Sequence, residues 1–460
     1  MSDQYYEHRR SLGGPVILIL IGVVILLVKT RVISGSLVAH WFAHYWPLLL
    51  ILIGIIKLIE YYFDKERGAP ARGVGAGLII LVIILIVFGL MASSAERVNW
   101  SALGGELNIP DDSDFMAGVF GSNYSYTQTL QQDFPKDASL RVVVSDRGDV
   151  TITTWDQPSI KVEVSKKVRA RDQNEANKID ENTHPTINTE GNVVTLNANT
   201  SGAGTGAAES DLNIYIPAKA AVDISTRRGS ITLQDRQGDV RASTTHGDVT
   251  VTNINGSVSA DMRSGSITAD KITGNLQVNG QVNDTNISNV NGSVRLTGEY
   301  FGQLNLAKIA GGVTFHTSRT DLELGKLDGD LTMESGDLRA REIAGPVRLV
   351  TKSKDIHLDG VTGDVKLENE NGLVEVHADK LPLGTMNISN SNGDIKVAVP
   401  SKAQFDVEAR AQNGEINTDF NGIKVENSGD NSQASGSNGS GGAKLQISNE
   451  HGNVDIRKLS

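Results

Sequence analysis

The chain has 460 residues, 48 of them glycine, with a formal net charge of −11, 5 % aromatic residues and no cysteine. This length predicts two to four domains. The negative charge excludes nucleic acid as an expected partner, because phosphates would be repelled. Without cysteine there is no disulfide, thiolate nucleophile or lipidated cysteine, although an extracytoplasmic location stays open.

Three apolar runs occupy the first part of the chain. Gly13–Val28 carries no charge, Trp46–Ile59 carries one lysine, and Gly73–Met91 has no charge over 19 residues. A helix needs about 20 residues to cross the hydrocarbon core, and the aromatic cluster Tyr61–Phe63 is typical of a membrane interface. We therefore expect residues 1–97 to form a three-helix anchor in the lipid bilayer.

Basic residues between the runs indicate the orientation of this anchor. One side of the membrane would hold Arg9, Arg10, Lys57, Lys65, Arg67 and Arg72, and the other side Lys29, Arg31 and Arg97. Because the more basic side faces the cytoplasm, we expect a cytoplasmic N-terminus and, after three spans, a C-terminal domain in the periplasm or outside the cell. If one run does not span, that domain lies in the cytoplasm instead.

The apolar region resembles a known membrane module. GGPVILILIGVVILLVKTRVI and HYWPLLLILIGIIKLIEYYF echo each other around Ile-Gly, and about residues 10–92 resemble the membrane region of LiaI/LiaF-type envelope-stress proteins. The resemblance implies a role in envelope-stress signalling. That family often has four spans, whereas this chain has three apolar runs.

A glycine repeat follows a polar linker at 98–137. Residues 139–168 predict three strands separated by turns, and we assign 138–228 to entry strands that cap a regular region at 229–392. In that region glycine, a small polar residue and an aliphatic residue recur, as in Gly247-Asp-Val and Gly265-Ser-Ile. Glycine at these positions predicts corners with positive φ.

A longer period of about 18 residues runs through the same region. Every other unit has an aliphatic residue two positions before its glycine, as at Ile254, Ile272 and Val290. A parallel β-solenoid needs such a superperiod because equivalent positions stack in successive coils, whereas antiparallel hairpins need only the shorter period. We therefore favour a mainly β fold, a parallel β-solenoid with about 18 residues per coil preceded by three transmembrane α-helices.

The last segment, 393–460, predicts further strands that form a C-terminal cap. It is interrupted at 428–443 by SGDNSQASGSNGSGGA, which is typical of a flexible low-complexity loop. Covers are expected at both ends of a solenoid, because an uncovered end exposes unpaired strand edges. An uncapped end would instead indicate a polymerising scaffold.

The β region also resembles a family. FPKDASLRVVVSDRGDVTITTWDQPSIKVEVSKKV, followed by serial glycine, Asp/Ser/Asn, aliphatic units, resembles the "putative adhesin" (DUF4097-type) family over about residues 135–459. The resemblance implies an envelope-exposed β-helical domain and supplies no established activity.

No catalytic motif is evident: GxSxG, HExxH and the P-loop are missing. Calcium is disfavoured because Asp, Ser and Asn interchange after the glycine, which a turn tolerates and a charged ligand site does not. Histidines at His40 and His44 have metal-ligand spacing but also suit an interfacial helix end. We interpret the remaining histidines as isolated surface residues: His184, His246, His316, His357, His377 and His451.

Stacking could bring carboxylates together, as in β-helices that cleave polysaccharides. The candidates are Asp239, Asp248, Asp261, Asp270 and Asp284, but they do not share one coil phase. We therefore expect no enzyme, no cofactor, and no catalytic, cofactor-binding or metal-binding residue.

Together these features predict a multi-pass protein of the bacterial inner membrane. Its extracytoplasmic solenoid would be an adhesin-like binding or scaffold protein of the cell envelope, with envelope polysaccharide or membrane proteins as candidate partners. An envelope-stress sensor or regulator acting through membrane partners is the alternative, and a polysaccharide-acting β-helix enzyme is the third hypothesis.

Overall fold

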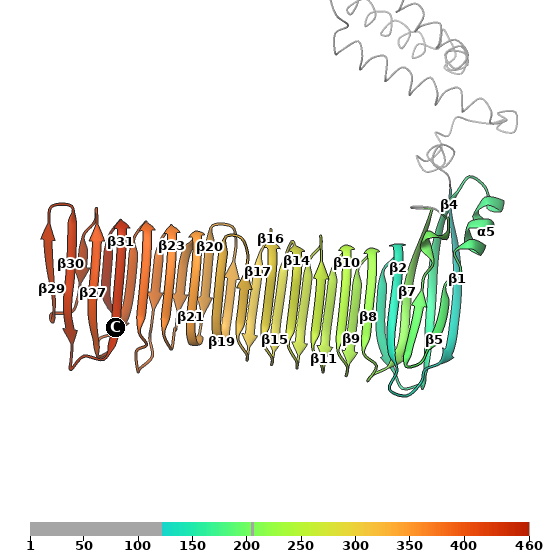
Figure 1. Cartoon of the computed structure of the whole chain (residues 1–460), viewed down its shortest axis with the longest axis horizontal. Coiled ribbons are helices and arrows are strands. Elements are labelled where there is room, and N and C mark those ends of the chain that lie inside the picture. Colours follow the sequence, from blue (N-terminus) through green and yellow to red (C-terminus); the bar gives the residue numbers. More distant parts are fainter. Residues whose placement is uncertain (1–121, 204–206, 460) are drawn as a thin grey trace, which may run out of the picture. The chain divides into compact units, whose positions relative to one another are not determined.

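A computed structural model of the chain describes residues 122–203 and 207–459, which belong to one contact unit, Ser122–Ser460. The membrane anchor predicted at 1–97 lies outside these residues, so its three transmembrane helices stay a prediction. Among the described residues, no helix is long and apolar enough to cross a membrane. The described residues are mainly β, and their strands follow one another along one axis (Figure 1).

Most coils contribute one strand to each of two facing sheets, which we call sheet A and sheet B. In spatial order, sheet A contains β5 (Thr186–Glu190), β6 (Val193–Asn197), β2 (Ser139–Arg147), β8 (Val222–Arg228), β10 (Val240–His246), β12 (Val258–Met262), β14 (Leu276–Val282), β16 (Val294–Tyr300), β18 (Val313–His316), the first half of β19 (Thr320–Met333), β21 (Ile343–Ser353), β23 (Val365–Asn371), β25 (Met386–Asn392), β31 (Ala443–His451), β27 (Phe405–Gln412), β30 (Asn431–Asn438) and β29 (Ile423–Ser428).

Sheet B follows the same axis. In spatial order it contains β1 (Ser122–Asp133), β4 (Ser159–Ala170), β7 (Ala208–Pro217), β3 (Val150–Trp155), β9 (Ile231–Arg236), β11 (Val249–Ile254), β13 (Ile267–Ile272), β15 (Thr285–Val290), β17 (Leu304–Ile309), the second half of β19, β20 (Asp337–Arg341), β22 (Asp355–Asp359), β24 (Val374–His377), β26 (Ile395–Pro400), β32 (Val454–Leu459) and β28 (Ile416–Thr418). Helix α5 (Gln173–Asn182) and the short 3-10 helix η2 (Thr200–Ala203) lie between strands in the chain.

The regular coils stack in parallel and in register. Val240 pairs with Val258 in sheet A, and Val249 pairs with Ile267 in sheet B, so equivalent residues are 18 positions apart. Alternate residues of each strand point inward, and the aliphatic ones are buried, for example Val251 at 0 % exposure. The predicted parallel β-solenoid with about 18 residues per coil is confirmed for these coils.

Two ladders of glycine form the corners of the coils. At one corner Gly247 and Gly265 have φ of +154° and +143°, and a Cβ on Gly247 would lie 2.1 Å from the carbonyl oxygen of Gly229. At the other corner Gly256 has no positive φ; its Cβ would lie 2.7 Å from the carbonyl oxygen of the preceding ladder glycine, and Asn253 takes the positive φ of 56° instead. The prediction of positive φ at every corner glycine is therefore right for one corner and wrong for the other.

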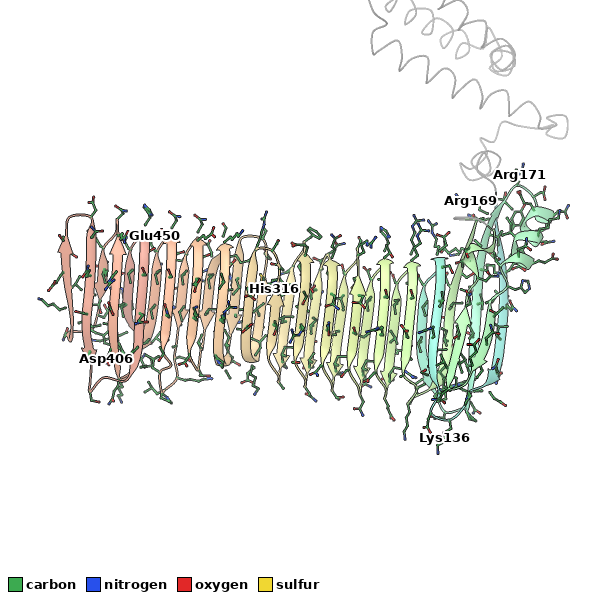
Figure 2. All side chains as sticks on the ribbon, viewed as in Figure 1. Lys136, Arg169, Arg171, His316, Asp406 and Glu450 are labelled. Atoms are coloured by element: carbon green, nitrogen blue, oxygen red, sulfur yellow. The ribbon has the colours of Figure 1, made fainter. Side chains whose placement is uncertain are left out.

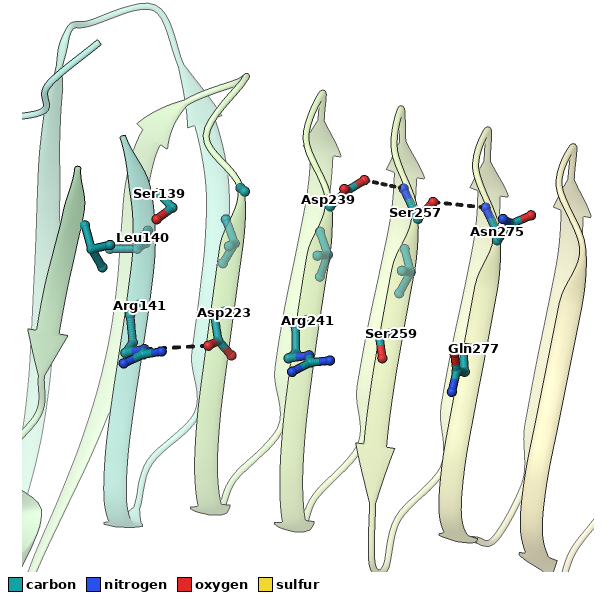
Figure 3. A pocket seen from close by; sticks show the side chains of 15 residues that line it. Ser139, Leu140, Arg141, Asp223, Asp239, Arg241, Ser257, Ser259, Asn275 and Gln277 are labelled. Atoms are coloured by element: carbon teal, nitrogen blue, oxygen red, sulfur yellow. Dashed lines mark hydrogen bonds and ion pairs between the residues drawn. The ribbon is translucent and has the colours of Figure 1, made fainter. Parts of the chain in front are cut away.

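The residue after each corner glycine caps the next coil. Asp239 Oδ1 accepts the backbone N–H of Ser257 at 2.8 Å, and Ser257 Oγ accepts that of Asn275 at 3.3 Å (Figure 3). Asn275 Oδ1 in turn accepts the N–H of Ser293 at 2.9 Å. Any small side chain with an acceptor oxygen can perform this role, which explains why Asp, Ser and Asn interchange there.

One coil runs in the opposite direction. The first half of β19 pairs antiparallel with β18 and β21, and its second half pairs antiparallel with β17 and β20. The strand crosses from sheet A to sheet B at a register shift between Leu324 and Lys326. The prediction of an uninterrupted regular solenoid over 229–392 is wrong at this coil, and parallel stacking resumes with β20 pairing to β22.

The chain order is permuted at the N-terminal end. The coil β2–β3 lies between the coils β6–β7 and β8–β9. Antiparallel strands cover the outermost coil: β1 pairs with β4, β4 with β7, and β5 with β6. Residues 122–133, which we assigned to the linker, therefore form a covering strand.

The coil order is also permuted at the C-terminal end. The chain builds β27 and β28 first, and β31 and β32 then fill the gap between them and the coil β25–β26. The prediction of a flexible loop at 428–443 is wrong for Asn431–Asn438, which forms β30 between β27 and β29. Ser432 and Ala434 of this strand are buried.

Two buried cations bind backbone carbonyls where the coil order is irregular. Arg236, 1 % exposed, donates to the carbonyl oxygens of Pro217 at 2.9 Å and Ala220 at 2.5 Å, and burial lowers its pKa to about 10. Lys354 donates to the carbonyl oxygens of Glu334 and Ser335 in the turn after β19, and burial lowers its pKa. Each cation donates hydrogen bonds to backbone carbonyls that the β-ladder does not pair.

Candidate functional site

The outward side chains of sheet B fall into two rows along the axis, because successive strands are in register. Figure 2 shows such side chains covering the outside of the β unit from end to end. The two rows change character at β19, and we therefore describe the strands before β19 and the strands after it separately.

The rows before β19 form a surface that we call the hydroxyl–amide face. Before β19 its first row is Asn213, Thr151, Thr232, Thr250, Thr268, Asn286 and Asn305, its second row is Tyr215, Thr153, Gln234, Thr252, Asp270, Ser288 and Ala307, and on β19 itself the two rows reach Thr332 and Asp330. Asp270 is the one ionisable acid in these rows before β19. Hydrogen bonds from Ser288 (2.6 Å) and then Asn289 (2.6 Å) lower its pKa.

Two aromatic rings lie at the β3 end of this face. The ring centroids of Trp155 and Tyr215 are 6.0 Å apart, with 41° between the planes. Trp155 Nε1 donates to the carbonyl oxygen of Ser159 at 2.7 Å, which fixes the orientation of the indole. Lys161 Nζ lies 5.4 Å from the Tyr215 centroid and 2.6 Å from Glu163 Oε1. Both rings are half-buried, so part of each is open to solvent.

The rows after β19 carry charge at nearly every position. The first row is Arg339, His357, Glu375, Lys396 and Asp455, and the second row is Arg341, Asp359, His377, Ala398 and Arg457. Beside them Asp330 at the end of β19 contacts Arg341, whose hydrogen bond lowers the pKa of that carboxyl.

Four of these side chains form a hydrogen-bonded chain that we call the His–carboxylate cluster. His377 Nδ1 lies 2.8 Å from Asp359 Oδ1, and its Nε2 lies 3.2 Å from Glu375 Oε1. His357 Nδ1 lies 3.0 Å from Glu375 Oε2. Both ring nitrogens of His377 therefore face carboxylate oxygens, one on β22 and one on its own strand.

The interpretation of His357 and His377 as isolated residues is therefore wrong. The two are one coil and two residues apart, which places them on neighbouring strands in adjacent rows. The 18-residue period was the signal that could have found this cluster. Among the described residues, no three His, Asp or Glu side chains are arranged to hold a metal ion.

The other predicted site residues do not converge. His316 contacts Asp321 at 3.4 Å, His184 contacts the carbonyl oxygen of Asp180 at 2.7 Å, and His451 contacts that of Ser391 at 3.3 Å. His246 is exposed at a corner, and His40 and His44 lie outside the described residues.

The five carboxylates proposed for stacking are also separate. Asp239, Asp248 and Asp284 accept backbone N–H groups at corners. Asp261 accepts from Asn279 in sheet A, whereas Asp270 lies in sheet B. The stacked catalytic groove that a polysaccharide-cleaving β-helix needs is therefore not formed by these residues.

The opposite face, on sheet A, is hollowed near the N-terminal end. A shallow cavity of about 520 Å³ crosses β2, β8, β10, β12 and β14. Arg141, Asp223, Arg241, Ser259 and Gln277 line it in one row, and Arg141 Nε lies 3.6 Å from Asp223 Oδ2 (Figure 3). Its charged lining distinguishes this surface from the hydroxyl–amide face.

Comparisons with known proteins give two families and several solved structures. The LiaI-LiaF-like transmembrane region matches residues 12–58, which associates the chain with a membrane. Similar solved structures include a "putative cell adhesion protein" from Clostridium sporogenes (8 % identity, 73 % of this chain and 100 % of that chain, TM-score 0.16) and a "putative adhesin" from Parabacteroides merdae (10 % identity, 73 % and 96 %, TM-score 0.22). No curated protein matches the chain.

The second family covers the solenoid. Its model, Toastrack DUF4097, matches residues 138–343 and again 286–457, which together span more than half of the chain. The two matches overlap across β15 to β20, on both sides of the reversed coil. The chain belongs to the toastrack DUF4097 family.

Proposed function

We propose that this protein is a membrane-anchored, extracytoplasmic β-solenoid that acts as an adhesin-like binding or scaffold protein of the bacterial cell envelope. The observation that carries the proposal is the order of the parts. A LiaI-LiaF-like transmembrane region at 12–58 precedes a toastrack solenoid at 138–457 in one chain. This order is what a binding surface tethered to the lipid bilayer requires.

The mechanism is the display of ordered side-chain rows on a stiff support. Corner glycines and capping side chains join each coil to the next, so the outer rows keep a fixed spacing of about 4.8 Å. Covering strands at both ends (β1 and β5, β29 and β30) support a binding surface rather than a polymerising one. Envelope polysaccharide or membrane proteins are the candidate partners, and the role is not enzymatic.

The proposed topology has a cytoplasmic N-terminus, three spans and an external β unit. Protease accessibility tests it on the full-length chain, with an antibody tag after Ser460. Protease added to intact cells, or to spheroplasts where an outer membrane is present, should remove the tagged β unit, because the inner membrane does not shield it. Cleavage only after lysis of the inner membrane would refute the external location.

A second candidate function is sensing of envelope stress through membrane partners. The LiaI-LiaF-like region favours it, because that match lies in the membrane part of the chain. Deletion of residues 12–58 in a strain that keeps the β unit tethered by an unrelated span separates the two functions. A changed envelope-stress reporter supports sensing, and an unchanged reporter favours binding alone.

A further inference from the structure

The hydroxyl–amide face has a composition that plain solubility does not require. The first row contains only threonine and asparagine from Asn213 to Thr332, although the chain as a whole is 21 % charged. The cavity on sheet A shows that the same coils accept charged residues, and the rows after β19 show that sheet B accepts them too. Side-chain hydroxyls and amides can both donate and accept hydrogen bonds.

The face also offers a stacking surface at its end. Tyr215 begins the second row, where it pairs in register with Thr153, and Trp155 lies beside it with 6.0 Å between the ring centroids. Half-buried aromatic rings next to hydrogen-bonding groups suit a ligand whose surface alternates apolar C–H patches with hydroxyls. A pyranose ring has that surface.

The spacing of the two rows and the charge of the protein restrict the class of polymer that this face can bind. The rows repeat at about 4.8 Å, close to the advance of one sugar along an extended β-linked chain. An anionic polymer is disfavoured because the protein carries a net charge of −11 and the two rows contain no cation. Neighbouring amides of Asn286 and Asn305, 2.9 Å apart, provide partners for acetamido groups.

We infer that the hydroxyl–amide face binds the uncharged, β-linked, N-acetylated glycan strand of the cell wall, with Trp155 and Tyr215 stacking on a sugar ring. The strand would lie along the axis and cross the coils. This inference rests on the proposed function, because it needs the β unit outside the inner membrane. It also specifies that function, since it names the polymer and the surface that holds it.

Binding is measured by co-sedimentation of the full-length protein in detergent micelles with insoluble chitin, which is a peptide-free glycan of this class, and with purified cell-wall sacculi. Thr268→Lys places a long cation in the first row, and Trp155→Ala removes the stacking ring. Thr297→Lys is the matched control, because Thr268 on β13 and Thr297 on β16 are both exposed threonines of central coils on opposite sheets.

The wild type should sediment with both chitin and sacculi. Thr268→Lys should weaken chitin binding at least ten-fold and Trp155→Ala at least three-fold, whereas Thr297→Lys should leave it unchanged. Binding to sacculi without chitin would assign the contact to peptide stems, and equal losses in both lysine variants would remove the face from the contact. Either result, or failure of the wild type to bind, overturns the inference. If the protease test places the β unit outside the inner membrane and glycan binding fails, the inference is wrong but the proposed function is still supported.

Discussion

The coils before and after β19 share one scaffold and carry different outer surfaces. Both sets stack in parallel and contain coils whose paired residues are 18 positions apart, and both use glycine corners capped by small polar side chains. The first set presents threonine and asparagine on sheet B, and the second presents arginine, histidine and carboxylates. Corners and inward residues are therefore constrained by stacking, whereas outward rows are free to specialise.

The reversed coil lies between the two surfaces. Because β19 is antiparallel to its neighbours on both sides, it joins two sets of coils that run in the same direction. The toastrack family model matches the chain twice, and the matches overlap around this coil. At each end of the solenoid, the coil order in space differs from the order in the chain. The coil β2–β3 lies one position inward from the N-terminal end, and the coil β31–β32 lies one position inward from the C-terminal end.

The largest expected effect tests the shared corners. Gly247→Ala should lower the free energy of unfolding by about 3 kcal/mol or more, because the residue has a φ of +154° and its Cβ would clash with a backbone oxygen. Chemical denaturation measures the change. Gly336→Ala is the control, since nothing lies within 4 Å of a Cβ there; a similar loss in both variants would mean that corner stacking is not the cause.

The next effect tests the irregular N-terminal end. Arg236→Ala should cost about 3 kcal/mol, because it leaves a cavity and removes the guanidinium donor from the carbonyl of Pro217 and from that of the buried Ala220. Arg236→Ile should cost less, since Ile254 occupies the equivalent buried position in the next coil and the cation itself is costly to bury. An Ile variant less stable than the Ala variant would contradict this account.

A smaller effect tests the interior of the coils after β19. Asn390 is 1 % exposed, and its Nδ2 donates to the carbonyl oxygens of Gly372 at 2.9 Å and Gly393 at 3.0 Å. Asn390→Ala should cost about 2 kcal/mol because the carbonyl of Gly372 loses its side-chain donor, whereas the carbonyl of Gly393 keeps Asn449 Nδ2 at 2.9 Å. Asn387→Ala on the exposed side of the same strand should change stability by less than about 0.5 kcal/mol. Equal losses would show that the interior amide is not the stabilising group.

The smallest effect tests the reversed coil itself. Asp321 on β19 accepts from Arg348 on β21 at 2.6 Å, and this hydrogen bond, followed by that of His316, holds the pKa of the carboxyl below its usual value. A lowered folded pKa stabilises the protein fully above about pH 4, and the contribution disappears as pH falls through the folded value. Asp321→Asn should therefore cost about 1 kcal/mol or less at pH 7 because the pair is partly exposed, and progressively less as the pH falls through the folded pKa of Asp321. A pH-independent cost would contradict the assignment.

The sequence predicted the regular coils well, because stacking forces the same inward aliphatic residues and corner glycines every 18 positions. It did not predict β19, whose Leu327-Asp-Gly329 imitates the repeat although the strand runs the other way. It also missed β30, since serine and glycine give no periodic apolar signal while the neighbours β27 and β29 supply the pairing.

The site was predicted less well than the fold. Outward residues carry no constraint from packing, so the hydroxyl–amide face and the His–carboxylate cluster became visible only when the register placed distant residues side by side. His357 and Glu375 illustrate this, because they are unremarkable in the chain and lie one coil apart in the sheet.

The direction of β19 is the central claim, and cysteine cross-linking tests it most directly in this cysteine-free chain. Asn305 pairs with Thr332 across β17 and β19, and neighbouring strands are close enough for a disulfide. The full-length Asn305→Cys/Thr332→Cys variant should therefore form an intramolecular disulfide under mild oxidation, and Asn305→Cys/Glu323→Cys should not. A disulfide in the second pair alone would place residues 18 positions apart together at this coil, and would contradict the reversal of β19.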